Sequence, residues 1–324
     1  MKNIAILTSG GDSPGMNAAI SAVVRASLHH KLKVVGILNG FEGLIDGRFI
    51  ELNASSVSNI IQRGGTILKS SRSKRFLEQS YRKIAFDRLK EKKIDGLIVL
   101  GGDGTFKGAS VFSKECDFPI IGIPCTIDND LFGTDFCIGY DTAINTAMDA
   151  IDKIRDTAES HSRLFFVEVM GRDAGLIALR SGIAGGAEAI LIPETKMNIE
   201  ELVGLLKKDR MLNYSSMIVV VAEGDEEGGA FNVSEKVKKQ LPDLDTRITA
   251  LGHIQRGGKP SCMDRILATR MGLAAVEGLI NGQKNTMVGI INNEVKFLLL
   301  ENSTKQSLNQ NQELLNVLEI LTSF

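Results

Sequence analysis

Short runs of apolar, often β-branched residues alternate along this chain with longer segments in which apolar residues recur at helical spacing. The short runs predict strands at residues 4–7, 34–38, 97–100, 120–123, 164–169, 217–221 and 288–291. Buried strands that alternate with helices are typical of an α/β fold whose sheet is largely parallel. The pattern therefore predicts α/β architecture.

The clearest helical pattern covers residues 142 to about 158, with Asp141 as its predicted N-cap. A second helix is predicted over residues 262–279 and ends near Gly282. The chain has no Pro/Ser-rich linker, so residues 139–141 are the candidate crossing between domains. The tail beyond residue 298 is polar and rich in Asn and Gln, and residues 314–318 then predict a short docking helix.

Composition narrows the class of protein. The 324 residues are enough for about two domains. A net charge of −1 gives no overall field for nucleic acid or a membrane, and the absence of Trp argues against stacking on single strands. We expect no signal segment and no membrane span. The four cysteines lack CxxC spacing and read as free thiols of a cytoplasmic protein.

The most informative segment is residues 124–130, Pro-Cys-Thr-Ile-Asp-Asn-Asp, which directly follows a predicted strand. Ligands of open parallel sheets bind where the strands end. Asp128 and Asp130 are too close in sequence for both to be buried without a cation, a donor or a proton between them. A magnesium-phosphate substrate would supply the cation, and an acceptor hydroxyl would give one aspartate a proton to take. An Asx-rich turn is the alternative.

Two glycine-rich segments follow other predicted strands, at residues 8–15 (TSGGDSPG) and 101–105 (GGDGT). Paired glycines let backbone N–H groups approach an anion, and the following helix adds a partial positive charge. Asp103 would reach a hydrated magnesium ion. A strained turn is the alternative for the first segment. The GGDG motif occurs in several ATP-using families, so it indicates the phosphoryl donor better than the acceptor.

Arg172 and Glu223 also follow predicted strands, so we expect them in the same crevice as the aspartates. Five arginines lie in Gly- or Ser-flanked segments, namely Arg72, Arg163, Arg172, Arg247 and Arg256. Guanidinium groups suit phosphate oxygens, and these are too many for one nucleotide, which indicates a second phosphorylated substrate. A solvated surface is the alternative for any one arginine, and a capped loop is the alternative for His253.

Together these motifs resemble those of bacterial ATP-dependent 6-phosphofructokinases, in family order and at family spacing, from residues 4–12 to residues 291–293. The resemblance implies two doubly wound three-layer α/β domains with mainly parallel sheets and an active site in the cleft between them. The ATP-binding domain would comprise residues 1–138 plus 257–304. The domain that binds fructose 6-phosphate would comprise residues 139–256 plus 305–324.

The resemblance also implies the reaction, which is the committed step of glycolysis. Magnesium-ATP would phosphorylate the 1-hydroxyl of fructose 6-phosphate and give fructose 1,6-bisphosphate and ADP. Asp128 would be the general base, and Thr126 and Arg172 would stabilise the phosphoryl group in transfer. Arg72 would bridge the two substrates.

The remaining roles follow from the same resemblance. ATP would be held by Gly11, Arg72, Ser73, Gly102, Asp103, Gly104, Thr105 and Gly108, and Mg²⁺ by Asp103 and Asp130. The sugar phosphate would meet Thr126, Asp128, Asp130, Met170, Gly171, Arg172 and Glu223, with its 6-phosphate clamped by Arg163, Arg247, His253 and Arg256. In the family Arg163 and Arg247 come from a neighbouring subunit, which implies a homotetramer with shared active sites.

The donor prediction rests on two positions. ATP users of the family commonly have glycine at the position of Cys125, whereas pyrophosphate-dependent relatives have lysine there and aspartate in place of Gly104. A small uncharged Cys125 together with Gly104 favours ATP. Pyrophosphate dependence is one alternative, and an inactive regulatory subunit that binds sugar phosphate is another. A lipid or NAD kinase that shares GGDG would leave residues 126–130 unexplained.

The residues that match the family's effector site depart from the family pattern more than those of the donor site. Arg25, Arg155 and Glu188 match its effector site for ADP or phosphoenolpyruvate. Ser21 and Ala54, however, stand where arginines are common, and residues 212–214 replace a lysine-bearing loop. Because these changes remove several cations, we expect weak or absent allosteric control by anionic effectors.

Overall fold

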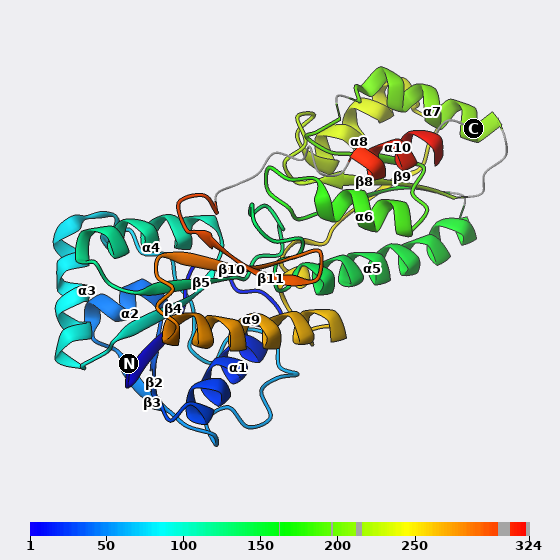
Figure 1. The fold of residues 1–324 in the computed structure, drawn as a ribbon. Helices are drawn as coiled ribbons and strands as arrows, with labels where there is room; N and C mark the ends of the chain where they lie inside the picture. Colours follow the sequence, from blue (N-terminus) through cyan, green and yellow to red (C-terminus); the bar gives the residue numbers. More distant parts are fainter. Residues whose placement is uncertain (162, 196, 212–215, 304–311, 322–324) are drawn as a thin grey trace. The chain divides into compact units, whose positions relative to one another are not determined.

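The computed structural model describes residues 1–161, 163–195, 197–211, 216–303 and 312–321. The chain divides into two compact units, each with its own sheet (Figure 1). The first comprises Met1–Thr142 and Arg256–Gln306, and the second comprises Ala143–Gln255 and Ser307–Phe324. The predicted boundary after residue 304 lies outside the described residues. What each unit binds stays a prediction.

The first unit contains a seven-stranded sheet in the order β11-β10-β5-β4-β1-β2-β3. Its strands are β1 (Asn3–Thr8), β2 (Lys33–Ile37), β3 (Phe49–Leu52), β4 (Gly96–Gly101), β5 (Ile120–Pro124), β10 (Thr286–Ile291) and β11 (Glu294–Leu299). The outermost strands β3 and β11 are antiparallel to their neighbours, and all other pairs are parallel. The adjacent strands β5, β4 and β1 therefore end at one edge of the sheet.

Helices cover both faces of this sheet (Figure 1). They are α1 (Met16–His29), α2 (Gly40–Asp46), η1 (Arg75–Leu77), α3 (Gln79–Glu91), α4 (Asp103–Cys116) and α9 (Cys262–Ile280). The short helix η2 (Gly252–Arg256) belongs to the second unit except for its last residue. The side chains of β1 alternate between two cores: Ile4 and Ile6 pack with residues of α1 and α9. Ala5 and Leu7 pack with residues of α2, α3 and α4. The result is the three-layer arrangement expected of a doubly wound fold.

The second unit has a four-stranded, entirely parallel sheet in the order β7-β8-β6-β9. Its elements are α5 (Tyr140–His161, which starts in the first unit), β6 (Leu164–Val169), α6 (Leu176–Ala184), β7 (Ala189–Leu191), α7 (Ile199–Met211), β8 (Met217–Ala222), α8 (Gly229–Gln240), β9 (Thr246–Ala250) and α10 (Gln312–Leu321). Alternate residues of β6 and β8 pack against α7 and α8. The terminal helix α10 contacts α6.

The predicted fold class, all seven predicted strands and the helix at residues 262–279 are confirmed. The predicted docking helix at residues 314–318 lies within α10. One local prediction is wrong: α5 begins at Tyr140, so Asp141 lies in its first turn and is not the N-cap. Strands β3, β7, β9 and β11 were not predicted.

A distant residue takes the place of the local cap. Asp264 of α9 is fully buried, and its carboxylate accepts hydrogen bonds from the backbone N–H groups of Gly139 and Thr142, both at 2.8 Å. The Thr142 hydroxyl also donates to this carboxylate, and it accepts from the backbone N–H of Ser261 at 2.9 Å. Burial raises the pKa of the Asp264 carboxyl. One side chain thus satisfies backbone donors at the start of α5 that lack helical partners.

We expect Asp264→Ala to lower the free energy of unfolding by about 3 kcal/mol, because it leaves several buried donors unsatisfied. Urea unfolding followed by circular dichroism measures this change. Asp152→Ala, at an exposed position of α5, is the matched control and should shift the free energy by less than about 0.5 kcal/mol. Equal midpoints for the two variants would contradict this role of Asp264.

Candidate active site

Three predicted binding loops meet at one edge of the first unit's sheet. They follow β1, β4 and β5 and comprise residues 9–15, 102–105 and 125–130; the second consists of Gly102 and the first residues of α4. Backbone hydrogen bonds extend the sheet past its strands, from Ser9 N to Leu100 O and from Cys125 N to Gly101 O, both at 2.9 Å. The Thr105 hydroxyl donates to Ser9 O at 3.1 Å. The loops therefore hold one another in place.

The turn after β5 keeps two carboxylates at this edge. Asp128 is 3% exposed and Asp130 is 7% exposed. Asn129 between them adopts a positive φ of 52°. Its side chain donates to Asp135 O at 3.1 Å and accepts from Cys137 N at 2.6 Å. Asn129 thus fixes the turn, and both neighbouring aspartates remain buried beside the glycine loops.

Cys125 gives this edge no charge. It is 1% exposed, and its backbone forms an isolated parallel bridge with Ile138. Burial raises the pKa of its thiol well above the usual range, so the side chain is neutral at physiological pH. Cys125 is therefore small and uncharged, as the prediction of ATP as the phosphoryl donor requires.

The glycine-rich segments differ in the space around their backbone. A Cβ atom at Gly104 would meet nothing within 4 Å, so this position opens onto free space. A Cβ atom at Gly11 would lie only 3.0 Å from a guanidinium nitrogen of Arg256. Glycine at residue 11 thus allows an arginine to approach the backbone, and glycine at residue 104 leaves room for a ligand.

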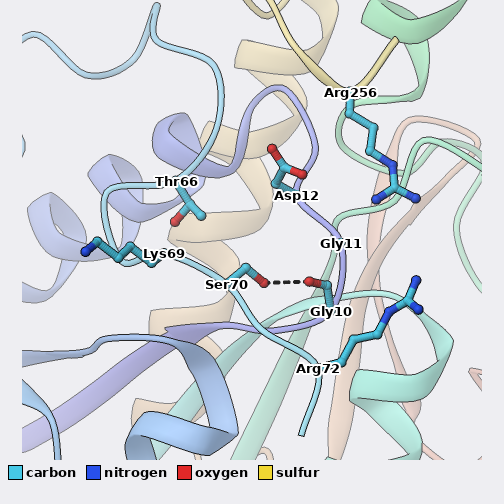
Figure 2. A pocket seen from close by; sticks show the side chains of 8 residues that line it. All are labelled: Gly10, Gly11, Asp12, Thr66, Lys69, Ser70, Arg72 and Arg256. Atoms are coloured by element: carbon cyan, nitrogen blue, oxygen red, sulfur yellow. Dashed lines mark hydrogen bonds between the residues drawn. The ribbon is translucent and has the colours of Figure 1, made fainter. Parts of the chain in front are cut away.

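A cavity of about 460 Å³ lies beside the first of these loops (Figure 2). It is lined by Gly10, Gly11, Asp12, Thr66, Lys69, Ser70, Arg72 and Arg256. In Figure 2 the Arg72 and Arg256 side chains approach the glycine backbone from two sides, whereas Lys69 extends away from them. Two guanidinium groups beside exposed backbone form a setting that suits phosphate oxygens. Sequence reasoning missed Thr66, Lys69 and Ser70, because no strand or helix pattern marks their loop.

Asp103, the first residue of α4, has an oxygen suited to a ligand. Its Oδ2 accepts from Lys107 Nζ at 2.7 Å, whereas the buried Oδ1 accepts no hydrogen bond from any described residue. Among the described residues, no three His, Cys, Asp or Glu side chains gather to hold a metal by themselves. Magnesium commonly takes one or two carboxylates plus waters and substrate phosphates. Asp103 and Asp130 therefore suit a magnesium ion that keeps waters and phosphate oxygens as its other ligands, and not a site closed by protein ligands alone.

In the second unit, Glu223 organises the turn that carries Arg172. The Glu223 carboxylate accepts from Arg172 N at 2.8 Å and from Gly171 N at 3.4 Å. Arg172 has a φ of 53°, and a Cβ atom at Gly224 would lie 1.8 Å from its carbonyl oxygen. The buried Met170 directly precedes this turn. The structure thus brings together four of the predicted sugar-binding residues, at the carboxyl ends of β6 and β8.

His253 belongs to the same edge, because η2 follows β9, the neighbour of β6. The backbone link from Leu251 N to Glu168 O, at 2.9 Å, ties the end of β9 to β6. The exposed His253 side chain is therefore available to a ligand at this edge.

Arg163 and Arg247 lie at the opposite edge of that sheet. Arg163 directly precedes β6, and Arg247 pairs in register with Phe165 near the start of β9. Asp245 accepts from Arg163 Nε at 2.7 Å and also from the Arg247 guanidinium, and the two arginines lower its pKa. At about 3.3 Å per residue, the length of β6 separates this pair from Met170 by roughly 20 Å. The two groups of residues therefore lie at opposite edges of the sheet, separated by about the length of β6.

Two of the three residues matched to an effector site are engaged with each other. Arg155 lies 3.4 Å from Glu188 and donates to Gly185 O at 2.8 Å. Burial raises the pKa of the Glu188 carboxyl. In the first unit, Arg25 donates to Ser21 at 3.4 Å. Residues 212–214 lie outside the described residues, and weak allosteric control stays a prediction.

Comparison with known proteins agrees with this geometry. Residues 3–279 match the phosphofructokinase family. The chain belongs to that family. It is 52% identical over 321 residues to the ATP-dependent 6-phosphofructokinase of Cytophaga hutchinsonii, covering 99% of this chain and 98% of that protein.

Two solved phosphofructokinase structures are similar to the chain along its whole length. The structure from Saccharomyces cerevisiae has a TM-score of 0.89 at 34% identity; it is matched over 99% of this chain, which spans 47% of the yeast chain. The pyrophosphate-dependent phosphofructokinase of Marinobacter aquaeolei has a TM-score of 0.86 at 25% identity, over 100% of this chain and 92% of that one. Within the described residues, no helix is both long and apolar enough to cross a membrane.

Two substitutions at Asn129 should separate the contribution of its side-chain hydrogen bonds to stability from that of its positive φ. Asn129→Gly tolerates the positive φ but loses both hydrogen bonds, so we expect about 1–2 kcal/mol of destabilisation. Asn129→Ala should cost about 1 kcal/mol more, because alanine disfavours this φ. Thermal and urea unfolding measure the stabilities of the two variants. If the alanine variant were the more stable one, the positive φ would carry no cost at this position.

Proposed function

We propose that this chain is an ATP-dependent 6-phosphofructokinase that converts fructose 6-phosphate and ATP into fructose 1,6-bisphosphate and ADP. The observation that carries the proposal is the meeting of three loops at the edge of β1, β4 and β5. There, the segment that carries the buried Asp128 and Asp130 is bonded to the end of β4, and Gly104 just beyond that end opens onto free space. Membership of the phosphofructokinase family supports it, as does 52% identity to a relative named for this activity.

Asp128 is the general base in this proposal. As the 1-hydroxyl oxygen attacks the γ-phosphorus, Asp128 takes its proton, and the bond from that phosphorus to the bridging oxygen breaks to release ADP. Phosphoryl transfer is loose, so the base mainly orients the nucleophile, and electrostatic stabilisation lowers most of the barrier. Thr126 and Arg172 stabilise the phosphoryl group, and Arg72 bridges the two substrates. Asp103 and Asp130 would hold magnesium, which would supply the positive charge that offsets the phosphates.

ATP is the donor that the site favours. The open space at Gly104 leaves room for a nucleotide, and the neutral Cys125 lacks the cation that pyrophosphate users of the family carry there. Ser73 and Gly108 lie toward the expected adenosine, and a Cβ atom at Gly108 would lie 3.4 Å from the Phe76 ring. Asp103, Asp128 and Arg172 are all present, which disfavours an inactive regulatory subunit.

The sugar phosphate is held by two subunits in this proposal. Met170, Gly171 and Glu223 contact the sugar, with His253 toward its 6-phosphate. The family resemblance assigns Arg256 to the same phosphate, although its guanidinium lies against Gly11 in this structure. Arg163 and Arg247 lie at the other edge of the sheet, so they serve the site of a neighbouring copy. Association of copies is supported by an exposed apolar stripe on α9, formed by Met263, Ile266, Leu273 and Ile280. The family makes a homotetramer the expected assembly, acting in the cytoplasm.

Two variants should divide chemistry from sugar-phosphate binding. Asp128→Ser should reduce kcat by about 10²–10⁴-fold with little change in fructose 6-phosphate affinity. Arg247→Ser should instead raise the KM for fructose 6-phosphate, because it removes a charge-assisted contact with the phosphate. Steady-state kinetics measures both. If the two phenotypes were exchanged, the assigned roles would be wrong.

Mixing these variants tests the shared site. If Asp128 and Arg247 serve one site from different subunits, random co-assembly gives about one intact site in four. Co-expressed subunits should then recover about a quarter of wild-type activity at limiting fructose 6-phosphate. No recovery beyond the mean of the two separate variants would mean that both residues act within one chain.

A further inference from the structure

The loop that carries Arg72 and Ser73 has little regular structure of its own. Between β3 and η1, residues 53–74 form neither a helix nor a strand. Long connections of this kind are uncommon in compact domains and often functional, and their position depends on contacts with the rigid elements beside them. What holds this loop therefore decides where Arg72 lies.

On the side that precedes Arg72, the loop is held by short polar contacts. Ser70 Oγ donates to Gly10 O at 2.8 Å, and Gly10 N donates to Ser71 O at 3.2 Å. Ser71 Oγ donates to Asn39 O at 2.7 Å, just before α2. These contacts fasten the loop to the end of β1 and to the start of α2.

After Arg72, the loop is held mainly by hydrogen bonds to one carboxylate. Glu42, in the first turn of α2, accepts from Ser73 Oγ at 2.5 Å and from Arg75 Nε at 2.8 Å. A second nitrogen of the Arg75 guanidinium donates to the same carboxylate. Chiefly through these bonds, Arg75 lowers the pKa of Glu42, which is therefore ionised at neutral pH.

The Ser73 hydroxyl also holds the backbone of the residue whose aromatic ring packs beside the loop. Ser73 Oγ accepts from Phe76 N at 3.1 Å. The Phe76 ring stacks on Phe41, the neighbour of Glu42 in α2, with centroids 3.9 Å apart and planes at 11°. The Ser73 hydroxyl is thus engaged with Glu42 and with the backbone of the loop. These hydrogen bonds hold the loop in position.

We propose that Glu42 is a positioning residue for the ATP site: it holds the loop just after Arg72, as Gly10 and Asn39 hold it just before. The inference rests on the proposed function, in which this segment binds ATP and bridges the two substrates. Arg72 then stands between two fastened points of an otherwise irregular loop. Loss of one point leaves the guanidinium of Arg72 without a defined place beside the phosphates.

Asp46 provides a matched control for charge. It also pairs with Arg75, at 2.9 Å, and with Arg48, at 2.8 Å, but it makes no hydrogen bond to Ser73 among the described contacts. Asp46→Asn therefore removes one carboxylate charge from Arg75 and keeps the Glu42–Ser73 bond. Glu42→Ala removes both kinds of contact, and Ser73→Ala removes the hydroxyl without a change in charge.

The experiment compares these variants of the full chain with ATP and fructose 6-phosphate varied separately. Because small misplacements of a substrate-positioning group are costly, we expect Glu42→Ala to raise the KM for ATP about tenfold and to lower kcat. The KM for fructose 6-phosphate should stay within about twofold. Ser73→Ala should shift the same two constants, and Ser73→Thr, which keeps the hydroxyl, should shift them less. Asp46→Asn should stay within about twofold of wild type throughout.

The outcomes separate this inference from the proposed function. An active wild type in which Glu42→Ala behaves like Asp46→Asn would overturn the role of Glu42 and leave the function intact. A rise in both KM values together with a large fall in Tm would also overturn it, since that result indicates general destabilisation. Titration calorimetry of wild type with magnesium-ATP is the second measurement. Absence of binding there would overturn the proposed function and this inference together.

Discussion

The parallel pairing of β1, β4 and β5 is the constraint on which the candidate site depends. Because these strands are adjacent and point the same way, three loops that are far apart in sequence emerge side by side. Backbone bonds continue past the strand ends, at Ser9 and Cys125, so the loops inherit the rigidity of the sheet. A phosphate cradle made of backbone and glycine needs this support, since it has few side chains of its own to define its shape.

The sequence predicted those parts of the fold in which local pattern and burial agree. The predicted strands are apolar runs in the cores, whereas the missed strands β3, β9 and β11 are largely exposed or half-buried and β7 has three residues. Interactions between distant residues left no local pattern. Asp264 replaces a local cap for α5, and Glu42 lies 31 residues from Ser73, so neither role could be predicted before the fold was known.

The sugar-phosphate residues show the difference between a motif and its geometry. The sequence grouped the arginines by residue type and loop context, which does not tell one edge of a sheet from the other. The register of β6 and β9 separates Arg163 and Arg247 from the turn at Arg172. Asp245 holds the two arginines together, so they form one cationic group. That separation is the physical ground for the proposal that two copies of the chain share each active site.

The central claim is that this site transfers a phosphoryl group from ATP to fructose 6-phosphate. The most direct test is a coupled assay of the purified wild-type protein with magnesium and fructose 6-phosphate, comparing ATP with pyrophosphate as the donor. The account predicts formation of fructose 1,6-bisphosphate with ATP and none above background with pyrophosphate. Activity with pyrophosphate alone would contradict it, because the open space at Gly104 and the neutral Cys125 would then not determine the donor.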